Sequence, residues 1–210
     1  MSKNAYFTVQ KCIETFIVIK KSKFISNVSP VNSQEEAEDF IETIRKKYWN
    51  ATHNVYAYTI GMNDDVQKFS DDGEPSGTAG KPVLEVLKSK EVKNAVVVVT
   101  RYFGGILLGA GGLVRAYSDS AARGLKEARV IKRIKCDEFE VISDYSLLGK
   151  LQWEIKQRSL IVSDTTFAEK VSLRVCVPLD YNLDFNELIL NITSGAGTIK
   201  WIRNYYIDDI

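Results

Sequence analysis

The chain has 210 residues, of which 45% are hydrophobic and 26% charged, and it carries a formal net charge of +1 at pH 7. This composition predicts a folded globular protein with one large or two small hydrophobic cores. No apolar run reaches the roughly 18 residues that a membrane helix needs, and the first ten residues lack the apolar core of a secretory signal, so we expect a cytoplasmic protein without a membrane partner.

The spacing of the cysteines and the distribution of charge narrow the class of protein and the kinds of partner that we expect. Cys12, Cys136 and Cys176 are far apart and form no CxxC pair, so neither a disulfide framework nor a zinc site is predicted, and no cofactor is expected. Residues 1–132 carry 19 Lys or Arg against 15 Asp or Glu, a net +4, whereas residues 133–210 carry 9 against 12, a net −3. This asymmetry permits an anionic partner for the first part without requiring one.

The first elements in chain order are β-structure and a helix. Residues 14–31 are rich in β-formers and contain a basic cluster in the middle, which predicts two strands, or one strand with a bulge. Residues 33–48 predict a helix capped by Asn32 or Ser33, because acidic residues fill its first turn and basic residues its last.

An alternating strand follows at residues 51–61 and contains His53, the single histidine of the chain. A lone histidine is more often a hydrogen-bonded structural residue than a metal ligand. A strand that ends near a polar loop can also bring its histidine into a cleft, so His53 is a secondary candidate for the site.

Residues 70–80 predict a loop, because their glycines and proline are incompatible with a helix or a strand. The backbone amides around Ser76, Gly77 and Thr78 can form an anion-binding nest. A helix that begins near Lys81 would add its positive end to such a nest. This loop is not a Walker motif, since it lacks the Gly-Lys-Ser/Thr ending and no apolar strand precedes it.

The same loop contains three carboxylates, Asp71, Asp72 and Glu74. They can hold a hard cation, or they can pair with Arg101 and Arg115 and so brace the loop. The second arrangement is the more ordinary one, and no metal site is assigned.

The next element is an apolar run at residues 95–100 with four consecutive valines, which predicts a strand buried on both faces. Arg101 and Tyr102 follow at its end, and a helix is expected from about Gly112 to Ala128. Glycines before a helix leave free amides that can grip phosphate or carboxylate, although they also permit tight packing. The candidate binding residues of this segment are Arg101, Tyr102, Gly104, Gly105, Gly111, Gly112 and Arg115.

The last part of the chain has the element order βαββαβ, which predicts a ferredoxin-like domain at residues 133–210 after a short linker near residues 130–135. Two helices would cover one face of a four-stranded antiparallel sheet. Its acidic balance and the absence of an aromatic RNA-binding pair argue against an independent RNA-recognition module, so a docking or regulatory domain is expected.

The segments SDDGEPSGTAGKP and VTRYFGGILLGAGGLVRAYSDSA, preceded by KSKFI and ATHNVYAY, resemble the signature of the IMPACT protein family and its bacterial members. The resemblance covers roughly the first 130 residues. It implies an α+β protein with two domains. Residues 1–132 would form a ribosomal protein S5 domain 2-like fold, and the C-terminal domain would resemble the fifth domain of elongation factor G. It also implies a role in translation control through a protein partner, RNA or the ribosome.

Three functions follow from these patterns. The first is a binding module in which the glycine-rich loops, Lys81, Arg101 and Arg115 hold the phosphates of RNA, of the ribosome or of a nucleotide. The second is a hydrolase that uses Asp71, Asp72 or Glu74 with His53, although no nucleophile and base pair is recognisable. The third is a protein-interaction scaffold. The first is favoured, and an enzyme is the less expected class.

Overall fold

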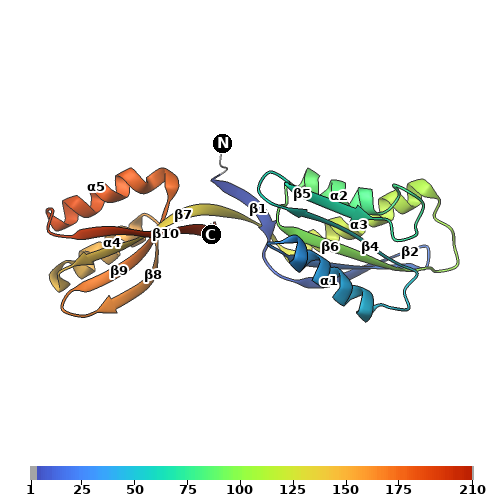
Figure 1. Cartoon of the computed structure of the whole chain (residues 1–210), viewed down its shortest axis with the longest axis horizontal. Helices are drawn as coiled ribbons and strands as arrows, with labels where there is room; N and C mark the ends of the chain where they lie inside the picture. Colours follow the sequence, from blue (N-terminus) through green and yellow to red (C-terminus); the bar gives the residue numbers. More distant parts are fainter. Residues whose placement is uncertain (1–3, 210) are drawn as a thin grey trace. The chain divides into compact units, whose positions relative to one another are not determined.

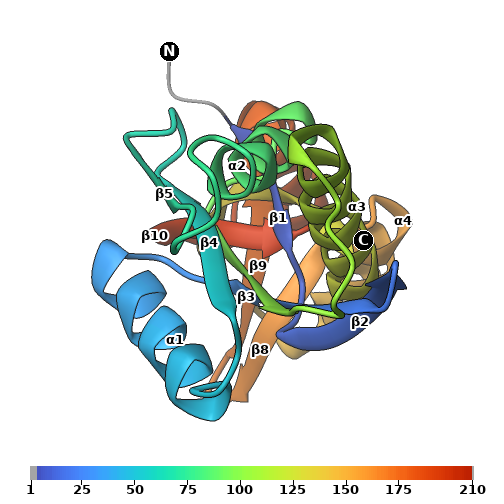
Figure 2. The same ribbon diagram turned by 90° about the vertical axis from the view of Figure 1, so that its right-hand side faces the viewer.

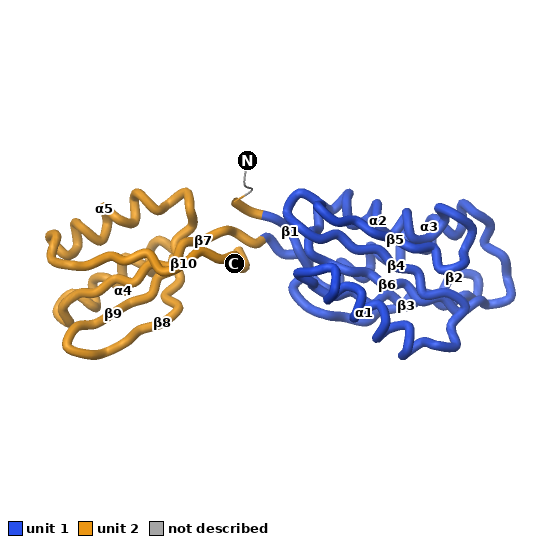
Figure 3. Tube along the Cα trace, in the orientation of Figure 1, with its two compact units in different colours: residues 1, 6–132 blue, residues 2–5, 133–210 orange. Residues whose placement is uncertain are grey.

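The computed structural model describes residues 4–209 and shows an α+β protein with two antiparallel sheets. The chain divides into two compact units (Figure 3). The N-terminal unit contains residues 6–132, and the C-terminal unit contains residues 133–209 together with Asn4 and Ala5. No helix within the described residues is long and apolar enough to span a membrane.

The N-terminal unit contains a five-stranded sheet with the order β2-β3-β6-β4-β5 and three helices (Figure 1). One face of the sheet is covered by α1, and the opposite face is covered by α2 and α3 (Figure 2). The elements are β2 (Ile13–Ile19), β3 (Ser22–Pro30), α1 (Gln34–Lys47), β4 (His53–Ile60), β5 (Val66–Ser70), α2 (Gly80–Ser89), β6 (Ala95–Tyr102) and α3 (Ala110–Ala128).

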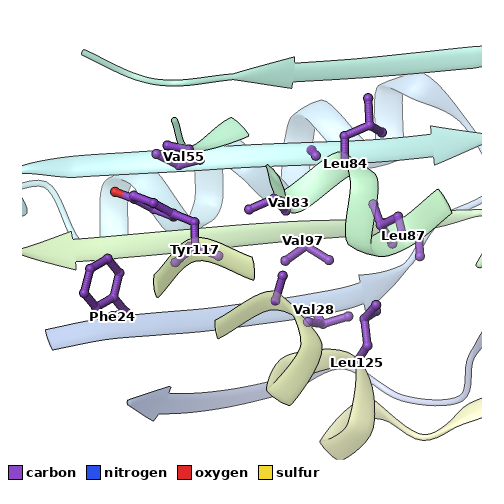
Figure 4. Close-up of a cluster of buried hydrophobic side chains, with 14 of the residues drawn as sticks. Phe24, Val28, Val55, Val83, Leu84, Leu87, Val97, Tyr117 and Leu125 are labelled. Atoms are coloured by element: carbon purple, nitrogen blue, oxygen red, sulfur yellow. The ribbon is translucent and has the colours of Figure 1, made fainter. Parts of the chain in front are cut away.

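Strand β6 forms the centre of this unit and is buried on both faces, as its valine run predicts. Val97 packs into the core shared with α2 and α3 (Figure 4), and Val99 belongs to the same core. Val96 and Val98 pack on the other face, against Ile41 and the rest of the apolar stripe of α1. Because its side chains enter the cores on both faces of the sheet, β6 holds the two helical layers together.

Residues 14–31 form two strands rather than one bulged strand. Lys20 and Lys21 have φ values of 44° and 67°, so the connection is a two-residue turn with both residues in the left-handed region. Ser33 caps α1 by accepting a hydrogen bond from the Glu36 amide (3.1 Å). Helix α3 begins at Ala110, two residues earlier than its glycines suggest.

The C-terminal unit has a sheet in which β10, β7, β9 and β8 lie side by side in that order, all antiparallel. The start of β1 (Ala5–Val9) joins the same sheet through the Asn4 carbonyl, which accepts from the Lys135 amide (2.7 Å). The remaining elements are β7 (Val130–Ser143), α4 (Leu148–Gln157), β8 (Ile161–Phe167), β9 (Val171–Pro178), α5 (Asn182–Thr193) and β10 (Thr198–Asp208), with single 3-10 turns at Tyr145–Leu147 and Leu179–Tyr181.

The two units meet between residues 132 and 133, within the linker expected near residues 130–135, but these residues are the first part of the continuous strand β7 rather than a loop. The core of the C-terminal unit lies between the sheet and helices α4 and α5. It contains Val141 and Leu173 from the strands, Leu151 from α4 and Phe185 from α5.

Candidate functional site

A pocket of about 430 Å³ lies at the end of the sheet where β6 finishes. The loop before α2 and the loop before α3 meet there, so the two glycine-rich segments form one site even though β6 separates them in sequence. The pocket is lined by Thr52, His53, Gly73, Glu74, Pro75, Arg101, Phe103, Leu107, Leu108, Gly109, Ala110 and Leu113.

The polar part of the pocket is built around the buried carboxylate of Glu74. Arg101 Nη1 and Tyr117 Oη both donate to Glu74 Oε1, at 2.6 and 2.7 Å. Arg101 and Glu74 are 5% and 8% exposed, so each charge is compensated mainly by the other. Burial, and then the Glu74 carboxylate, raise the pKa of Tyr117, which keeps its hydroxyl a donor. The positive charge of Arg101 is therefore compensated inside the protein by the Glu74 carboxylate.

Aromatic rings hold the guanidinium of Arg101 in place. Its Cζ atom lies 5.5 Å from the ring centre of Phe24 and 5.5 Å from that of Phe103. Strand pairing sets Arg101 opposite His53 on β4. Strand β6 thus delivers Arg101, and β4 delivers His53, to the same end of the sheet.

His53 is both hydrogen-bonded and in the pocket. Its Nδ1 lies 2.7 Å from the carbonyl oxygen of Asp72. A carbonyl oxygen only accepts, so Nδ1 carries a proton and donates to it. The other ring nitrogen, Nε2, lies 3.8 Å from Glu74 Oε2. The two readings of this histidine, as a structural residue and as part of the cleft, are compatible.

The Asp71 carboxylate accepts hydrogen bonds from backbone amides of the first glycine-rich loop. Its Oδ1 accepts from the amides of Ala79 (3.0 Å) and Gly80 (2.8 Å), and its Oδ2 accepts from the amide of Gly77 (2.8 Å). This carboxylate caps the N-terminus of α2, where negative charge is stabilising. An external anion at these amides would have to displace Asp71. Thr78 is occupied as well, since its hydroxyl donates to the Pro75 carbonyl (2.6 Å), whereas Ser76 is exposed.

Asp72 braces the loop against the neighbouring elements. Its Oδ2 accepts from the amide of Asn54 on β4 (2.6 Å), and its Oδ1 lies 3.5 Å from Arg45 Nη2 on α1. Arg115 pairs with none of the three loop carboxylates within the described residues, whereas Arg101 pairs with Glu74. Among residues 4–209, no group of three or more His, Cys, Asp or Glu residues could hold a metal ion.

The second loop, residues 103–109, is shaped by glycines at three positions. Gly104 lies against the β2–β3 turn, where an added Cβ would be 2.1 Å from the carbonyl carbon of Lys21. Gly105 and Gly109 have φ values of 81° and 70°, which other residues rarely adopt. Gly104 donates its amide to Ser22 Oγ (3.1 Å), and this contact fixes the loop beside the turn.

Helix α3 begins at the rim of the pocket with free amide donors. Its first intrahelical bond runs from the Leu113 amide to the Gly109 carbonyl (2.9 Å). The amides of Ala110, Gly111 and Gly112 have no acceptor in the part of the chain that the structure describes. These donors and the positive end of the helix dipole form an anion-accepting position.

Several candidate residues lie outside the pocket lining. Tyr102 points to Asn50, to which its hydroxyl donates (2.8 Å), and Lys81 and Arg115 are exposed on α2 and α3. Sequence reasoning did not select the apolar lining residues Leu107 and Leu108. In the sequence, the signal for these residues was a short apolar patch between glycines. In the structure, Leu107 is 82% exposed.

Comparison with known proteins places this chain in a family. The Impact N-terminal domain model matches residues 20–125, and the Domain of unknown function (DUF1949) model matches residues 141–196. "IMPACT family member YvyE" of Bacillus subtilis (strain 168) is 45% identical over 197 residues, which cover 94% of this chain and 91% of that protein. "IMPACT family member YigZ" of Escherichia coli (strain K12) is 34% identical over 180 residues, covering 85% and 88%.

A solved structure agrees with these relatives. The chain titled "Crystal structure of an hypothetical protein" has a TM-score of 0.61 and 30% identity, with 96% of this chain and 98% of that chain covered. The two domain models and the full-length similarity lead to one conclusion: the chain is a bacterial-type member of the IMPACT family, with an Impact N-terminal domain followed by a DUF1949 domain.

Proposed function

We propose that this protein is a nucleic-acid- or ribosome-associated binding protein linked to translation regulation, and that it binds RNA through the second glycine-rich loop. The observation that carries the proposal is the contact between this loop and the basic β2–β3 turn. Gly104 packs on the backbone of Lys21, so the apolar tip of the loop and the lysines of the turn share one surface.

The charges of this surface are available to a partner. Lys21, Lys81 and Arg115 are exposed, and none of them forms an ion pair with a described residue. Arg115 lies in the second turn of α3, close in sequence to the free amides at the start of that helix. Lysine and arginine contacts to phosphates supply most of the sequence-independent affinity for nucleic acids. We assign phosphate binding to these exposed residues. To Arg101 we assign a different role, which is to hold the pocket residues in position.

The apolar tip of the loop supplies the second element of an RNA-binding surface. Phe103 is 46% exposed and follows the end of β6 directly. Exposed aromatic rings beside basic residues stack on unpaired bases, a contact worth roughly 1–3 kcal/mol per base. A single strand with accessible bases is therefore the form of RNA that fits best.

We also propose the finer fold assignment, with domains at residues 1–132 and 133–210. The strand order β10-β7-β9-β8 corresponds to 4-1-3-2 in a βαββαβ unit, which supports the ferredoxin-like plan and its likeness to the fifth domain of elongation factor G. For the N-terminal domain we propose the ribosomal protein S5 domain 2-like fold. Both assignments favour a role in translation.

The test is the salt dependence of binding to a fluorescently labelled single-stranded RNA, supported by co-sedimentation with ribosomes. Removing one phosphate contact lowers the slope of log K against log salt by about 0.7. We expect Lys21→Ala and Arg115→Ala each to weaken binding and reduce the slope by this amount. Lys46→Ala, an exposed lysine on α1 at the opposite face of the sheet, is the matched control. Unchanged slopes in both variants would contradict the proposal.

One observation favours a hydrolase as the second candidate. His53 Nε2 and Glu74 Oε2 are adjacent in the pocket, which is how a general acid–base pair is arranged. A screen of hydrolase substrates with and without divalent cations tests it. Turnover that disappears in His53→Asn would support the enzyme. Asp72→Asn tests the loop carboxylates in the same assay, although Asp72 is already engaged by Asn54 and Arg45.

The third candidate function, a protein-interaction scaffold, predicts a different result in the binding experiment. If the protein binds ribosomes and this binding is insensitive to salt and to Arg115→Ala, an apolar protein contact through Phe103 and Leu107 explains it better than a phosphate contact.

A further inference from the structure

We infer that the pocket at the end of β6 binds a guanine base unstacked from single-stranded RNA. The inference rests on the proposed RNA-binding function and names what the pocket recognises. It is carried by two adjacent hydrogen-bond acceptors in a pocket that also contains large apolar side chains.

The first acceptor is His53 Nε2. Because Nδ1–H donates to the Asp72 carbonyl, the neutral imidazole has its lone pair on Nε2. His53 lines the pocket, and no described residue donates a hydrogen bond to Nε2. The backbone thus fixes the tautomer that can accept from a ligand.

The second acceptor is Glu74 Oε2. Arg101 and Tyr117 both donate to the other oxygen, Oε1, and no described residue donates to Oε2. The Glu74 side chain is only 3% exposed, so Oε2 reaches solvent only through the pocket, and a ligand donor there would replace water. The two acceptors are 3.8 Å apart, so a ligand with two neighbouring N–H donors can satisfy both.

The walls of the pocket fit a flat, mostly apolar body. The large apolar side chains in the lining are Pro75, Phe103, Leu107, Leu108 and Leu113. Its volume of about 430 Å³ accommodates one heterocyclic base and lies within the roughly 300–1,000 Å³ range of small-molecule sites. An aromatic ring at the wall is the usual stacking partner for a base removed from its neighbours.

The pair of acceptors selects among the bases. Guanine presents N1–H and the N2 amino group side by side on its Watson–Crick edge. Adenine, cytosine and uracil each place an acceptor next to their donor, so one of them would set an acceptor against His53 Nε2 or Glu74 Oε2. A site built to hydrogen-bond two donors rejects an analogue that lacks one, because a buried polar group is then left unpaired.

The rim of the pocket provides a place for the phosphate of the same nucleotide. Gly109 and Ala110 line the pocket, and the amides of Ala110, Gly111 and Gly112 at the start of α3 have no acceptor within residues 4–209. A base held at Glu74 and a phosphate at this helix end therefore occupy two ends of one cavity.

The experiment compares four labelled eight-nucleotide RNAs: all-uridine, and the same chain with one central guanosine, inosine or adenosine. Inosine keeps N1–H and lacks the N2 amino group. We expect the guanosine chain to bind at least about tenfold more tightly than the inosine chain, the effect of one hydrogen bond to a charged acceptor. Guanosine monophosphate should also compete better than inosine monophosphate.

The outcomes separate this inference from the proposed function. Salt-dependent binding of all four RNAs with equal affinity would overturn guanine recognition and leave RNA binding intact. Absence of binding to every RNA would remove both. Only a preference for guanosine over inosine and adenosine supports the pocket assignment.

A protein variant provides the second measurement. His53→Asn can keep a donor for the Asp72 carbonyl while removing Nε2. We expect it to weaken the guanosine chain about fivefold, the effect of one neutral hydrogen bond. The all-uridine chain, measured with the same variant, is the reference, and the ratio of the two affinities should fall by this factor. An unchanged affinity for the guanosine chain would contradict the assignment of Nε2.

Discussion

The ion pair between Arg101 and Glu74 should be the most sensitive point of the N-terminal unit. Its two atoms Nη1 and Oε1 lie 2.6 Å apart, and the side chains are only 6% and 3% exposed. Arg101→Met removes the guanidinium and leaves the Glu74 carboxylate buried with Tyr117 as its main donor. Breaking a buried pair by removing one partner costs about 3–5 kcal/mol. This is a large part of the roughly 5–15 kcal/mol stability of a domain.

Native-state hydrogen exchange of the β6 amides in the full chain measures this loss within the correct unit. Arg45→Met is the matched control, because Arg45 also pairs with a loop carboxylate, at 3.5 Å, but its side chain is 36% exposed. We expect this control to lose no more than about 1 kcal/mol.

The double variant Arg101→Met/Glu74→Gln isolates the unpaired charge. The side-chain amide introduced by Glu74→Gln would still accept from Tyr117 without a buried negative charge, so the double variant should be more stable than Arg101→Met alone. The reasoning is refuted if Arg101→Met costs no more than Arg45→Met, or if the double variant is the less stable of the two.

Three further predictions concern backbone fit, helix capping and titration. Gly104→Ala should lower the melting temperature, because its Cβ would clash with the Lys21 backbone, whereas Gly111→Ala, with open space around it, should be neutral or slightly stabilising; equal effects would contradict this. Asp71→Asn should cost about 1 kcal/mol in urea unfolding through the weakened α2 cap, and Asp119→Asn on the exposed face of α3 is its control. Burial raises the pKa of Cys136 from 9.0 to about 11. The folded state therefore holds this proton longer than the unfolded state, and stability falls as pH rises from 9 to 11, by at most about 1.4 kcal/mol per pH unit. The unfolding free energy of the wild type minus that of Cys136→Ala, followed by Trp153 and Trp201 fluorescence, should decline over this window, and a flat difference would refute it.

Sequence reasoning succeeded where one short segment contains the whole signal. The alternation at residues 53–60 places Val55 and Ala57 in one core and Tyr58 in the other. The cap and charge pattern around Ser33 predicts α1, and consecutive valines predict β6. In each case, neighbouring residues set the period or the cap, and the tertiary structure agrees with them.

It failed where a segment is short or its signal is mixed. β5 (Val66–Ser70) is an edge strand with no fully buried residue, so its sequence has no apolar alternation to detect. β1 (Ala5–Val9) was not predicted either. Residues 130–135 contain the boundary between the two units, as expected, but their strand conformation as the start of β7 was not predicted.

The sequence by itself determined the elements with a strong local pattern, the family and the concentration of glycines and carboxylates in two loops. Only the tertiary structure decided which charged groups of these loops are paired inside the protein. Arg101, a candidate phosphate ligand, forms an ion pair with Glu74, which lies 27 residues earlier in the chain. The backbone amides that were expected to bind an anion donate to the carboxylate of Asp71 instead. Such pairings depend on which chain ends a sheet brings together, and local sequence patterns do not contain that information. The free acceptors at His53 and Glu74 are the result of that arrangement.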